Sequence, residues 1–352
     1  MPDKLRKLLE SEPAEASAPC RIDMGGTLDI STFYYPLRHI SPCTFNIAMN
    51  LRTRVRLLPH ARGKVKISSR GFENAEYPAD AAPFAHPLGL MFAVAAYFGA
   101  SGVRIDIDSA SPPRSALGGS SAAAVALVAA FEKLMGRTSG AAPLSRENTA
   151  LLAHALEESV AGVPCGLQDQ LAAAYGGVNA WYWPGEIGSP AFSRRVIRDK
   201  QSPDSLRQHL LVAYCGIPHE SRNINGRWVE QFLSGKHRSL WAEIIECTQK
   251  FVEALSAGEI QMACEMMNRE TRIRRKMTPD VLEEMGENLA RAAIENKCGA
   301  RFTGAGGGGC IWALGETDAV RKLKGVWTDI LSQRKGACLL DAAIDSEGLI
   351  LG

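Results

Sequence analysis

Residues 111–136 read SPPRSALGGSSAAAVALVAAFEKLMG, and the rest of the chain is organised around them. The segment before them, 103–109 (VRIDIDS), alternates apolar and polar residues as a half-buried strand does. Two prolines follow, then a Gly-Gly-Ser-Ser loop at 118–121 and an alanine-rich apolar run that stops at Gly136. The stretch therefore predicts a strand, a Gly/Ser loop and a long helix, in that order.

This order is well suited to binding an anion. Glycines let the backbone approach a phosphate closely, and the first turn of a helix offers unpartnered N–H groups and the positive end of its dipole. Serine hydroxyls can add hydrogen bonds or a ligand for Mg²⁺. The alternative is that Ser120 or Ser121 only caps the helix. The Walker pattern G-x-x-x-x-G-K-[S/T] is absent, so a nucleotide site here would not be an ordinary P-loop.

The composition predicts a cytoplasmic protein of two domains. The chain has 352 residues, 46% of them hydrophobic, which exceeds what one ordinary core holds. A formal net charge of +2 with scattered basic residues argues against a nucleic-acid partner. Nine widely spaced cysteines without a C-x-x-C favour free thiols in a reducing compartment. The charged N-terminus is unlike a signal peptide. The sequence has no long apolar run free of charges, so we expect no membrane partner.

A short strand and a turn come early in the chain, in RIDMGGTLD at 21–29. The turn at Gly25 and Gly26 is expected to present Asp29. Residues 1–19 before it look like a short helix and a loose lead-in. Segments 51–58 and 64–69 follow and predict two antiparallel strands with an arginine-rich, solvated face.

Two acidic residues lie on either side of the loop at 162–168. A helix predicted over 145–160 brings Glu157 to its C-terminal end, where a carboxylate faces the negative end of the helix dipole. This placement suggests a cation nearby, although a solvated end is the simpler alternative. Asp169 begins the next helix, where capping is its simpler role.

The second half of the chain predicts an α+β domain after a link at 181–204. Its glycine loop, TGAGGGG at 303–309, formally matches G-x-G-x-x-G, but a dinucleotide loop must open a helix. Here the loop is followed by CIWAL at 310–314, which reads as a strand, so it joins two strands. Such a loop can pass close to a ligand, or it is only a tight turn.

Together these segments resemble the motifs of the GHMP kinases, the superfamily of galactokinase, homoserine kinase, mevalonate kinase and phosphomevalonate kinase. PPRSALGGSSAA (112–123) is similar to its nucleotide-phosphate motif and TGAGGGG to its C-terminal glycine motif. RIDMGGTLD is similar to its substrate motif, and CGLQDQ (165–170) to the acidic segment of its sugar kinases. The motifs occur in the family's order and cover most of the chain. The start motif and the Gly-x-Gln-Asp-Gln segment most resemble D-glycero-D-manno-heptose 7-phosphate kinases.

The resemblance implies an α+β two-domain fold with an N-terminal ribosomal S5-like α/β domain, a C-terminal ferredoxin-like α+β domain and an active site between them. The expected divisions are a lead-in at 1–19, a nucleotide- and substrate-binding domain at 20–200 and a C-terminal domain at 201–352. The resemblance also implies ATP and Mg²⁺ as cofactors and a small-molecule sugar phosphate as substrate. A homodimer is a possible assembly.

The resemblance assigns roles to individual residues. Asp169 would accept the proton of the attacking sugar hydroxyl or orient it, and Arg21 would stabilise charge beside it. Ser120 and Glu157 would hold Mg²⁺, with Ser121 as the alternative to Ser120. The residues expected to bind ATP are Pro113, Arg114, Ser115, Ala116, Leu117, Gly118, Gly119, Ser120 and Ser121. Those expected to bind the sugar are Asp29, Gly25, Gly26, Gly166, Arg222, Gly304, Gly306 and Gly307.

Two positions depart from the family motif, which usually has glycine where this chain has Arg114 and Ala116. The side chain at Ala116 is expected to restrict the loop. A sugar 7-phosphate also needs a cationic pocket, for which arginine is suited because its planar fork matches phosphate oxygens. Arg222 is the first candidate because it follows a strand and a glycine. The other candidates are Arg272, Arg274, Arg275 and Lys276.

Two further functions remain as alternatives. One is a kinase for another substrate, such as fucose, galactose or a mevalonate-like alcohol. The galactokinase start motif has a Glu-His pair before its aspartate, whereas this chain has Gly-Thr-Leu at 26–28, which argues against galactose. The other is a non-catalytic sugar and nucleotide sensor on the same scaffold. The presence of Arg21, Glu157 and Asp169 disfavours the sensor.

Overall fold

The computed structural model describes residues 2–140, 142–197, 206–218 and 224–352. Its strands are β1 (Ala14–Met24), β2 (Cys43–Pro59), β3 (Lys64–Ser69), β4 (Ala75–Pro78), β5 (Val103–Ser109), β6 (Val178–Tyr182), β7 (Ser193–Val196), β8 (Leu210–Tyr214), β9 (Gly299–Phe302), β10 (Cys310–Leu314), β11 (Cys338–Leu340) and β12 (Ile350–Leu351). Its helices are α1 (Pro2–Ser11), α2 (Ser31–Leu37), α3 (Gly89–Tyr97), α4 (Gly119–Ser139), α5 (Arg146–Ala161), α6 (Gln168–Tyr175), α7 (Ile224–Leu233), α8 (Arg238–Ala257), α9 (Ile260–Met277), α10 (Glu284–Glu295) and α11 (Thr317–Ser332). Short 3₁₀ helices are η1 (Arg38–Ile40), η2 (Leu206–His209) and η3 (Pro279–Val281).

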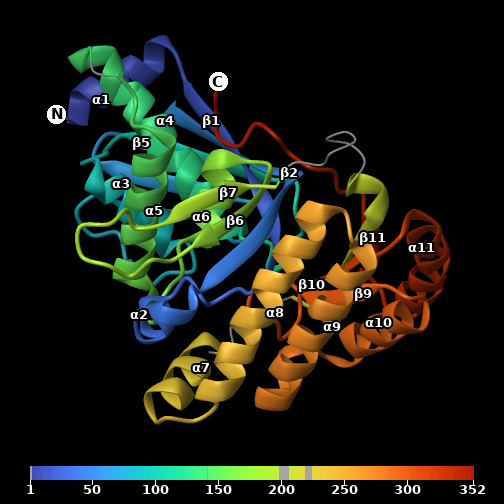
Figure 1. Cartoon of the computed structure of the whole chain (residues 1–352). Helices are drawn as coiled ribbons and strands as arrows, with labels where there is room; N and C mark the ends of the chain where they lie inside the picture. Colours follow the sequence, from blue (N-terminus) through green and yellow to red (C-terminus); the bar gives the residue numbers. More distant parts are fainter. Residues whose placement is uncertain (1, 141, 198–205, 219–223) are drawn as a thin grey trace.

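These elements form two adjoining domains, each with a sheet and helices of its own (Figure 1). The first sheet has eight strands in the order β12-β1-β2-β5-β3-β4, with β6 paired to β2 and β7 paired to β6. The second has four antiparallel strands in the order β11-β8-β10-β9. The expected two-domain α+β fold is therefore confirmed.

The long helix α4 is the core helix of the first domain. It begins after Gly118 and ends before Gly140, and both glycines adopt left-handed φ angles of 73° and 69° that other residues avoid. Its residues 122–131 are all buried, and the helix packs on β1 and β2. Residues 119–137 are long and apolar enough to span a membrane, but most of this segment is buried inside the protein. The expected order of strand, loop and helix is confirmed by β5 and α4.

The sheet order corrects one expectation about the strands. β2 and β3 run in opposite directions but do not pair, because β5 lies between them, antiparallel to β2 and parallel to β3. The connection between them passes over the start of β5. There Gly102 accepts a hydrogen bond from the backbone N–H of His60 and donates one to the carbonyl of Lys64. This pairing depends on a segment about forty residues away, which a local pattern does not reveal.

Three segments belong to the first sheet although they were expected elsewhere. Residues 14–19, expected in the lead-in, form the first part of β1. The expected link contributes the end of β6 and all of β7, and the domain boundary near residue 200 lies outside the described residues. The last residues of the chain return to this sheet, where β12 pairs with β1 and Ile344 bridges to Met49. Arg52, expected on a solvated face, forms an ion pair with Asp345 of this returning segment.

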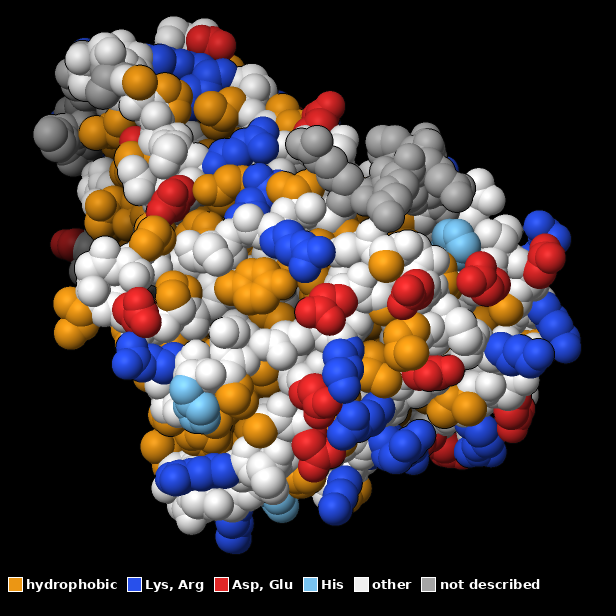
Figure 2. Space-filling model, in the orientation of Figure 1, with side chains coloured by type: hydrophobic (Ala, Val, Ile, Leu, Met, Phe, Trp, Pro, Cys, Tyr) orange, Lys and Arg blue, Asp and Glu red, His pale blue; other side chains and the backbone are white. Residues whose placement is uncertain are grey.

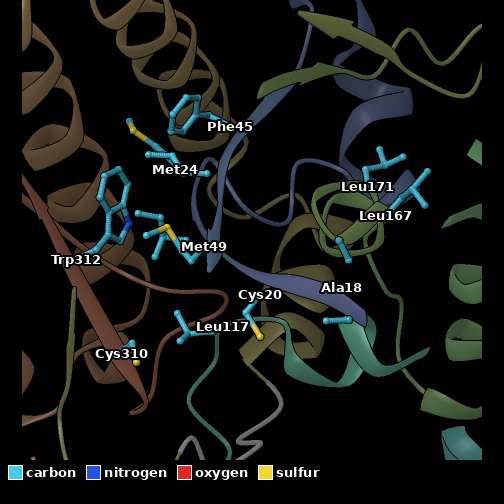
Figure 3. Packing of buried hydrophobic residues seen from close by; sticks show 14 of the residues in the cluster. Ala18, Cys20, Met24, Phe45, Met49, Leu117, Leu167, Leu171, Cys310 and Trp312 are labelled. Carbon is cyan, nitrogen blue, oxygen red and sulfur yellow. The ribbon is translucent and has the colours of Figure 1, made fainter. Parts of the chain in front are cut away.

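Apolar side chains fill the contact between the two sheets. Figure 3 shows Met24, Phe45 and Met49 of the first sheet near Trp312 of β10. The Trp312 indole donates a hydrogen bond to the carbonyl of Asp23 at 3.0 Å, and Phe45 lies edge-on to Phe251 of α8 with ring centroids 5.0 Å apart. One continuous core therefore holds the two domains together. On the surface drawn in Figure 2, acidic and basic side chains are interspersed, in keeping with the small net charge.

Candidate active site

The two glycine loops meet at one cavity of about 950 Å³. The backbone N–H of Cys310, at the end of the second loop, donates to the carbonyl of Ser115 in the first loop at 2.9 Å. A Cβ added at Gly304 would lie 3.4 Å from the carbonyl oxygen of Ala116. The predicted site residues that line the cavity are Arg21, Gly26, Asp29, Pro113, Arg114, Ser115, Ala116, Gly118, Gly119, Ser120, Glu157, Gly166, Asp169 and Gly304. The two loops, each expected to contribute to the active site, therefore lie against each other.

Arg21 and Asp169 form a bidentate ion pair at the cavity wall. Nε and Nη2 of Arg21 donate to Oδ1 and Oδ2 of Asp169 at 2.7 Å each. The remaining nitrogen, Nη1, donates to the carbonyl of Ala116 at 2.7 Å. Burial lowers the pKa of Arg21, but the carboxylates of Asp169 and Asp23 outweigh it and raise that pKa overall. Strand β1 and the first turn of α6 thus hold a fixed arginine–carboxylate pair next to the loop at 112–121, the predicted nucleotide loop, as the resemblance implies.

Asp29 is a buried acceptor that opens onto the cavity. It is 5% exposed, and its Oδ2 accepts a hydrogen bond from the backbone N–H of Gln168 at 3.0 Å. Its Oδ1 has no hydrogen-bond partner among the described residues. A Cβ added at Gly166 would lie 1.8 Å from Asp29, so only glycine allows this approach. Burial raises the pKa of Asp29 to about 7. The free oxygen can accept a hydrogen bond from a ligand hydroxyl.

Glu157 and Ser120 line another part of the cavity wall. Oε2 of Glu157 accepts hydrogen bonds from Ser121 Oγ at 2.8 Å and from Gln170 Nε2 at 2.7 Å. Burial raises the pKa of Glu157 to about 7, against the hydrogen bonds that it accepts. Ser121 is bonded to Glu157 and is not among the residues that line the cavity. Of the two serines, Ser120 is therefore the one that faces the cavity.

The pair formed by Ser120 and Glu157 fits Mg²⁺. This ion keeps several waters and is commonly held by one or two carboxylates together with substrate phosphates. Within the described ranges, no three His, Cys, Asp or Glu side chains form a metal-binding group, and this mode of binding needs none. A nearby cation would also favour the ionised form of a buried carboxyl group such as that of Glu157.

The nucleotide loop keeps a glycine-like backbone at both positions where the family motif departs. Arg114 has a φ angle of 53° and Ala116 one of 60°, both in the left-handed region. A residue with a side chain pays about 1–2 kcal/mol for that conformation. The neighbouring hydrogen bonds to Arg21 and Cys310 hold the loop there. The side chain of Ala116 therefore does not keep the loop out of the left-handed conformation that a glycine would adopt.

Three predicted sugar-binding glycines pack against protein instead of lining the cavity. A Cβ added at Gly25 would lie 2.6 Å from Thr248 of α8, and one at Gly306 would lie 2.3 Å from the carbonyl oxygen of Val281. A Cβ at Gly307 would meet a side chain of α7 at 2.9 Å. None of the three is among the cavity-lining residues of the described chain, and their contact with the sugar stays a prediction. These glycines allow close packing of the loops, which the sequence does not distinguish from close approach to a ligand.

Two other residues, Leu117 and Arg222, were predicted to bind ATP and the sugar. Leu117 is buried and does not line the cavity, and its carbonyl accepts a hydrogen bond from the backbone N–H of Arg21 at 2.9 Å. Leu117 therefore anchors the loop to strand β1 and to the core. Arg222 lies outside the described residues.

The cationic cluster on α9 does not reach the cavity. Arg274 is fully buried, and it donates to the carbonyl of Gly26 at 2.6 Å and to Glu270 at 2.9 Å. Arg275 is turned to the surface and pairs with Glu287 at 2.6 Å. Successive residues point in different directions around a helix, so one arginine of the cluster is in the core and its neighbours are outside. The cluster is excluded as a pocket for a substrate phosphate.

A buried ion network, missed by the sequence analysis, connects the second domain to the cavity. Arg301 donates to Asp23 at 2.9 Å and to Glu270 at 3.0 Å, and Glu270 also accepts from Arg274. These four side chains are 0% exposed. The other oxygen of Asp23 accepts the backbone N–H of Gly304 at 2.7 Å. Burial raises the pKa of Glu270, but the two arginines outweigh it and lower that pKa overall. The alternation of Arg21 and Asp23 along β1 was the only sequence signal of this network.

Further cavity residues were also missed. Asn225, in the first turn of α7, lines the cavity, and its buried Oδ1 is without a hydrogen-bond partner in the part of the chain that is described. Arg70, Phe72 and His86 line the cavity near the nucleotide loop. The guanidinium of Arg114 lies 5.9 Å from the ring centroid of Phe72. Because these residues come from segments without glycine motifs, no sequence pattern identified them.

The fold and the site together define a two-domain α+β protein in which a glycine loop at a helix N-terminus faces an arginine–carboxylate pair. Two family models match the sequence of this chain: "GHMP kinases N terminal domain" over residues 86–177 and "GHMP kinases C terminal" over residues 251–331. The chain belongs to the GHMP kinase family.

Similar proteins differ in the substrates that their names give. Mevalonate kinase of Pyrococcus horikoshii is 27% identical over 229 residues, which cover 60% of this chain and 59% of that protein. D-glycero-alpha-D-manno-heptose 7-phosphate kinase of Campylobacter jejuni is 24% identical over 205 residues, 57% of this chain and 58% of that protein. The matches thus span less than two thirds of these relatives.

Solved structures of the same fold cover nearly the whole chain. Galactokinase of Lactococcus lactis, complexed with galactose, matches with a TM-score of 0.74 at 17% identity, covering 99% of this chain and 98% of that one. A D-glycero-D-manno-heptose 1-phosphate kinase of Bacteroides thetaiotaomicron matches with a TM-score of 0.66 at 16% identity, covering 96% and 98%. At these identities the likeness is one of fold.

Proposed function

We propose that this protein transfers the terminal phosphoryl group of ATP to a hydroxyl group of a small molecule. The observation that carries the proposal is the bidentate pair of Arg21 and Asp169, which opens onto the same cavity as the glycine loop that begins α4. Phosphoryl transfer is catalysed mainly by positioning and by neutralisation of charge, and this arrangement provides both.

Each part of the site has a place in the reaction. Gly118, Gly119 and the free N–H groups of α4 bind phosphate oxygens. Asp169 accepts a hydrogen bond from the attacking hydroxyl, whose oxygen bonds to the terminal phosphorus as the bond to the bridging oxygen of ADP breaks. The hydroxyl proton passes to Asp169 or to the phosphate. Because two nitrogens of Arg21 donate to its two oxygens, Asp169 is held in one orientation and works mainly by orienting the acceptor.

Mg²⁺, when bound, neutralises charge on the phosphates, and Ser120 and Glu157 would hold it. Arg21 donates to Asp169 with two nitrogens, so it fixes the orientation of the carboxylate toward the acceptor.

We further propose that the acceptor is a sugar phosphate: the anomeric hydroxyl of D-glycero-D-manno-heptose 7-phosphate, converted to the 1,7-bisphosphate for nucleotide-activated heptose and surface polysaccharide. The likeness to the Campylobacter jejuni heptose 7-phosphate kinase supports this choice, although the mevalonate kinases are equally similar. The unpartnered oxygens of Asp29 and Asn225 suit a polyol, because each accepts a hydrogen bond from a hydroxyl group. Arg222, three residues before Asn225 in the sequence, remains our candidate for the distal phosphate.

A substrate panel tests both levels of the proposal. ADP release would be measured with ATP and Mg²⁺ against heptose 7-phosphate, galactose, fucose and mevalonate. We expect turnover with the heptose phosphate and a much lower kcat/KM with the others. Turnover of another alcohol alone would contradict the substrate and leave the reaction class intact. No turnover with any acceptor would contradict the kinase.

The location and assembly of the protein are also proposals. All nine cysteines lie among the described residues as free thiols, which supports the proposed cytoplasmic location. A homodimer stays a prediction.

A further inference from the structure

Two buried side chains donate to the same oxygen of the Glu157 carboxylate. Gln170 Nε2, at 2.7 Å, and Ser121 Oγ, at 2.8 Å, both donate to Oε2. Both donors are buried, Gln170 at 1% and Ser121 at 4% exposure. The other oxygen, Oε1, receives a bond from neither of them, and Glu157 lines the cavity beside Ser120. The two donors therefore fix which oxygen remains available to the cavity.

The amide of Gln170 is oriented by Glu157. Its Oε1 is buried and has no hydrogen-bond partner within the described residues. A buried amide oxygen without a partner is unfavourable, so the surroundings of Oε1 do not explain why the Gln170 amide has this orientation. The opposite orientation would set the amide oxygen against the carboxylate oxygen. The contact with Glu157 is thus the interaction that the Gln170 side chain is placed to make.

Gln170 is also the neighbour of Asp169 on α6. The first residue of this pair faces Arg21 and the second faces Glu157, so one helix turn orients both carboxylates of the site. A shift of this turn of α6 would move Asp169 and, through Gln170, would also disturb the orientation of Glu157 on α5.

We propose that Gln170, assisted by Ser121, is a positioning residue that turns Oε1 of Glu157 toward the metal of Mg²⁺–ATP, with the Ser120 hydroxyl as the second protein ligand. This inference rests on the proposed function. It distinguishes the adjacent serines: the side chain of Ser121 is bonded to Oε2 of Glu157, whereas Ser120 lines the cavity and is also a hydrogen-bond partner of Glu157. Residues that orient a metal ligand commonly contribute a factor of about 10–100 in metal affinity or activity.

The test measures binding by calorimetry, with a non-hydrolysable ATP analogue in the presence of Mg²⁺ and again in the presence of a chelator. Gln170→Leu removes the donor and keeps the side-chain bulk, and Ser121→Ala removes the second donor. Gln249→Leu is the matched control, because its amide donates to the carbonyls of Ile40 and Ser41 at 2.8 and 2.9 Å and does not line the cavity.

We expect Mg²⁺ to strengthen binding to the wild-type protein, and Gln170→Leu to lose about 10–100-fold of this gain with its metal-free affinity unchanged. Ser121→Ala should lose a smaller factor, and Gln249→Leu should match the wild type. Retention of the full gain in both Gln170→Leu and Ser121→Ala would overturn the inference. Absence of nucleotide binding to the wild type would instead overturn the proposed function. If Gln170→Leu does not fold, Ser121→Ala decides alone, since alanine is favourable in a helix.

Discussion

Asp29 lines the cavity, and the burial of its carboxylate destabilises the folded protein when the group is ionised. Its carboxyl group is buried, and burial raises its pKa to about 7. In the unfolded chain the pKa of an aspartate is about 3.9. The folded state therefore binds the proton more tightly, so the contribution of Asp29 to the free energy of unfolding is largest at low pH. It declines as the pH rises from about 4 to about 7.

We predict that Asp29→Asn stabilises the folded protein at neutral and alkaline pH. Asparagine keeps an acceptor for the backbone N–H of Gln168 and removes the buried charge. The free energy of unfolding should rise by about 2–4 kcal/mol at pH 8 and change little at pH 4, because each pKa unit corresponds to about 1.4 kcal/mol. Urea unfolding at both pH values measures the difference. Asp80→Asn, at an exposed position, is the control. An effect of Asp29→Asn that does not depend on pH would contradict the prediction.

At the scale of elements, the second glycine loop has two kinds of glycine. Gly304 lines the cavity, whereas Gly306 packs on the carbonyl of Val281. Gly306 shares its φ angle of 77° with Gly63, which has no atom within 4 Å of an added Cβ. The two positions thus differ in packing and not in backbone conformation.

We predict that Gly63→Ala lowers the free energy of unfolding by about 1–2 kcal/mol, the cost of a left-handed residue with a side chain. Gly306→Ala should cost about 1–3 kcal/mol more, because the new methyl group overlaps a backbone carbonyl. Chemical denaturation of the two variants and the wild type gives both values. Equal costs would show that the loop yields at Gly306 and would contradict the packing described above.

Elements that depend on local pattern were predictable from the sequence. The alternation of 103–109 and the Gly/Ser loop after it predicted β5 and α4, and the glycine loop followed by the strand-like CIWAL predicted that the loop joins two strands, which are β9 and β10. Features that depend on distant partners were not predictable. β5 inserts between β2 and β3 through pairing across the sheet. Ala116 adopts a left-handed conformation because its carbonyl is bound to Arg21, ninety-five residues away.

At the scale of the molecule, the buried ion network joins the second domain to the cavity. It contains three arginines and three carboxylates if Arg21 and Asp169 are included, so its charges balance. Arg274 also lies 4.7 Å from the ring centroids of both Trp228 and Trp241. The sequence does not reveal this network, because Arg274 reaches partners 247 and 248 residues away, whereas the other basic residues around it, Arg272, Arg275 and Lys276, are exposed.

We predict that Glu270→Gln lowers the free energy of unfolding by about 3–5 kcal/mol, because it leaves buried arginine charge without its partner. Glu246→Gln, which breaks an exposed pair with Lys250, should cost about 0.5 kcal/mol or less. Urea unfolding of the two variants at neutral pH measures both changes. Similar small effects would contradict the role assigned to the network.

The most direct test of the account is the turnover and nucleotide binding of Asp169→Asn. Asparagine can neither accept the proton nor form the charged pair with Arg21, and it leaves the glycine loop in place. We predict that turnover with the substrate of the wild-type protein falls by a factor of about 100 or more, whereas the affinity for ATP is retained. Undiminished turnover by Asp169→Asn would contradict the catalytic role assigned to Asp169 and its pair with Arg21.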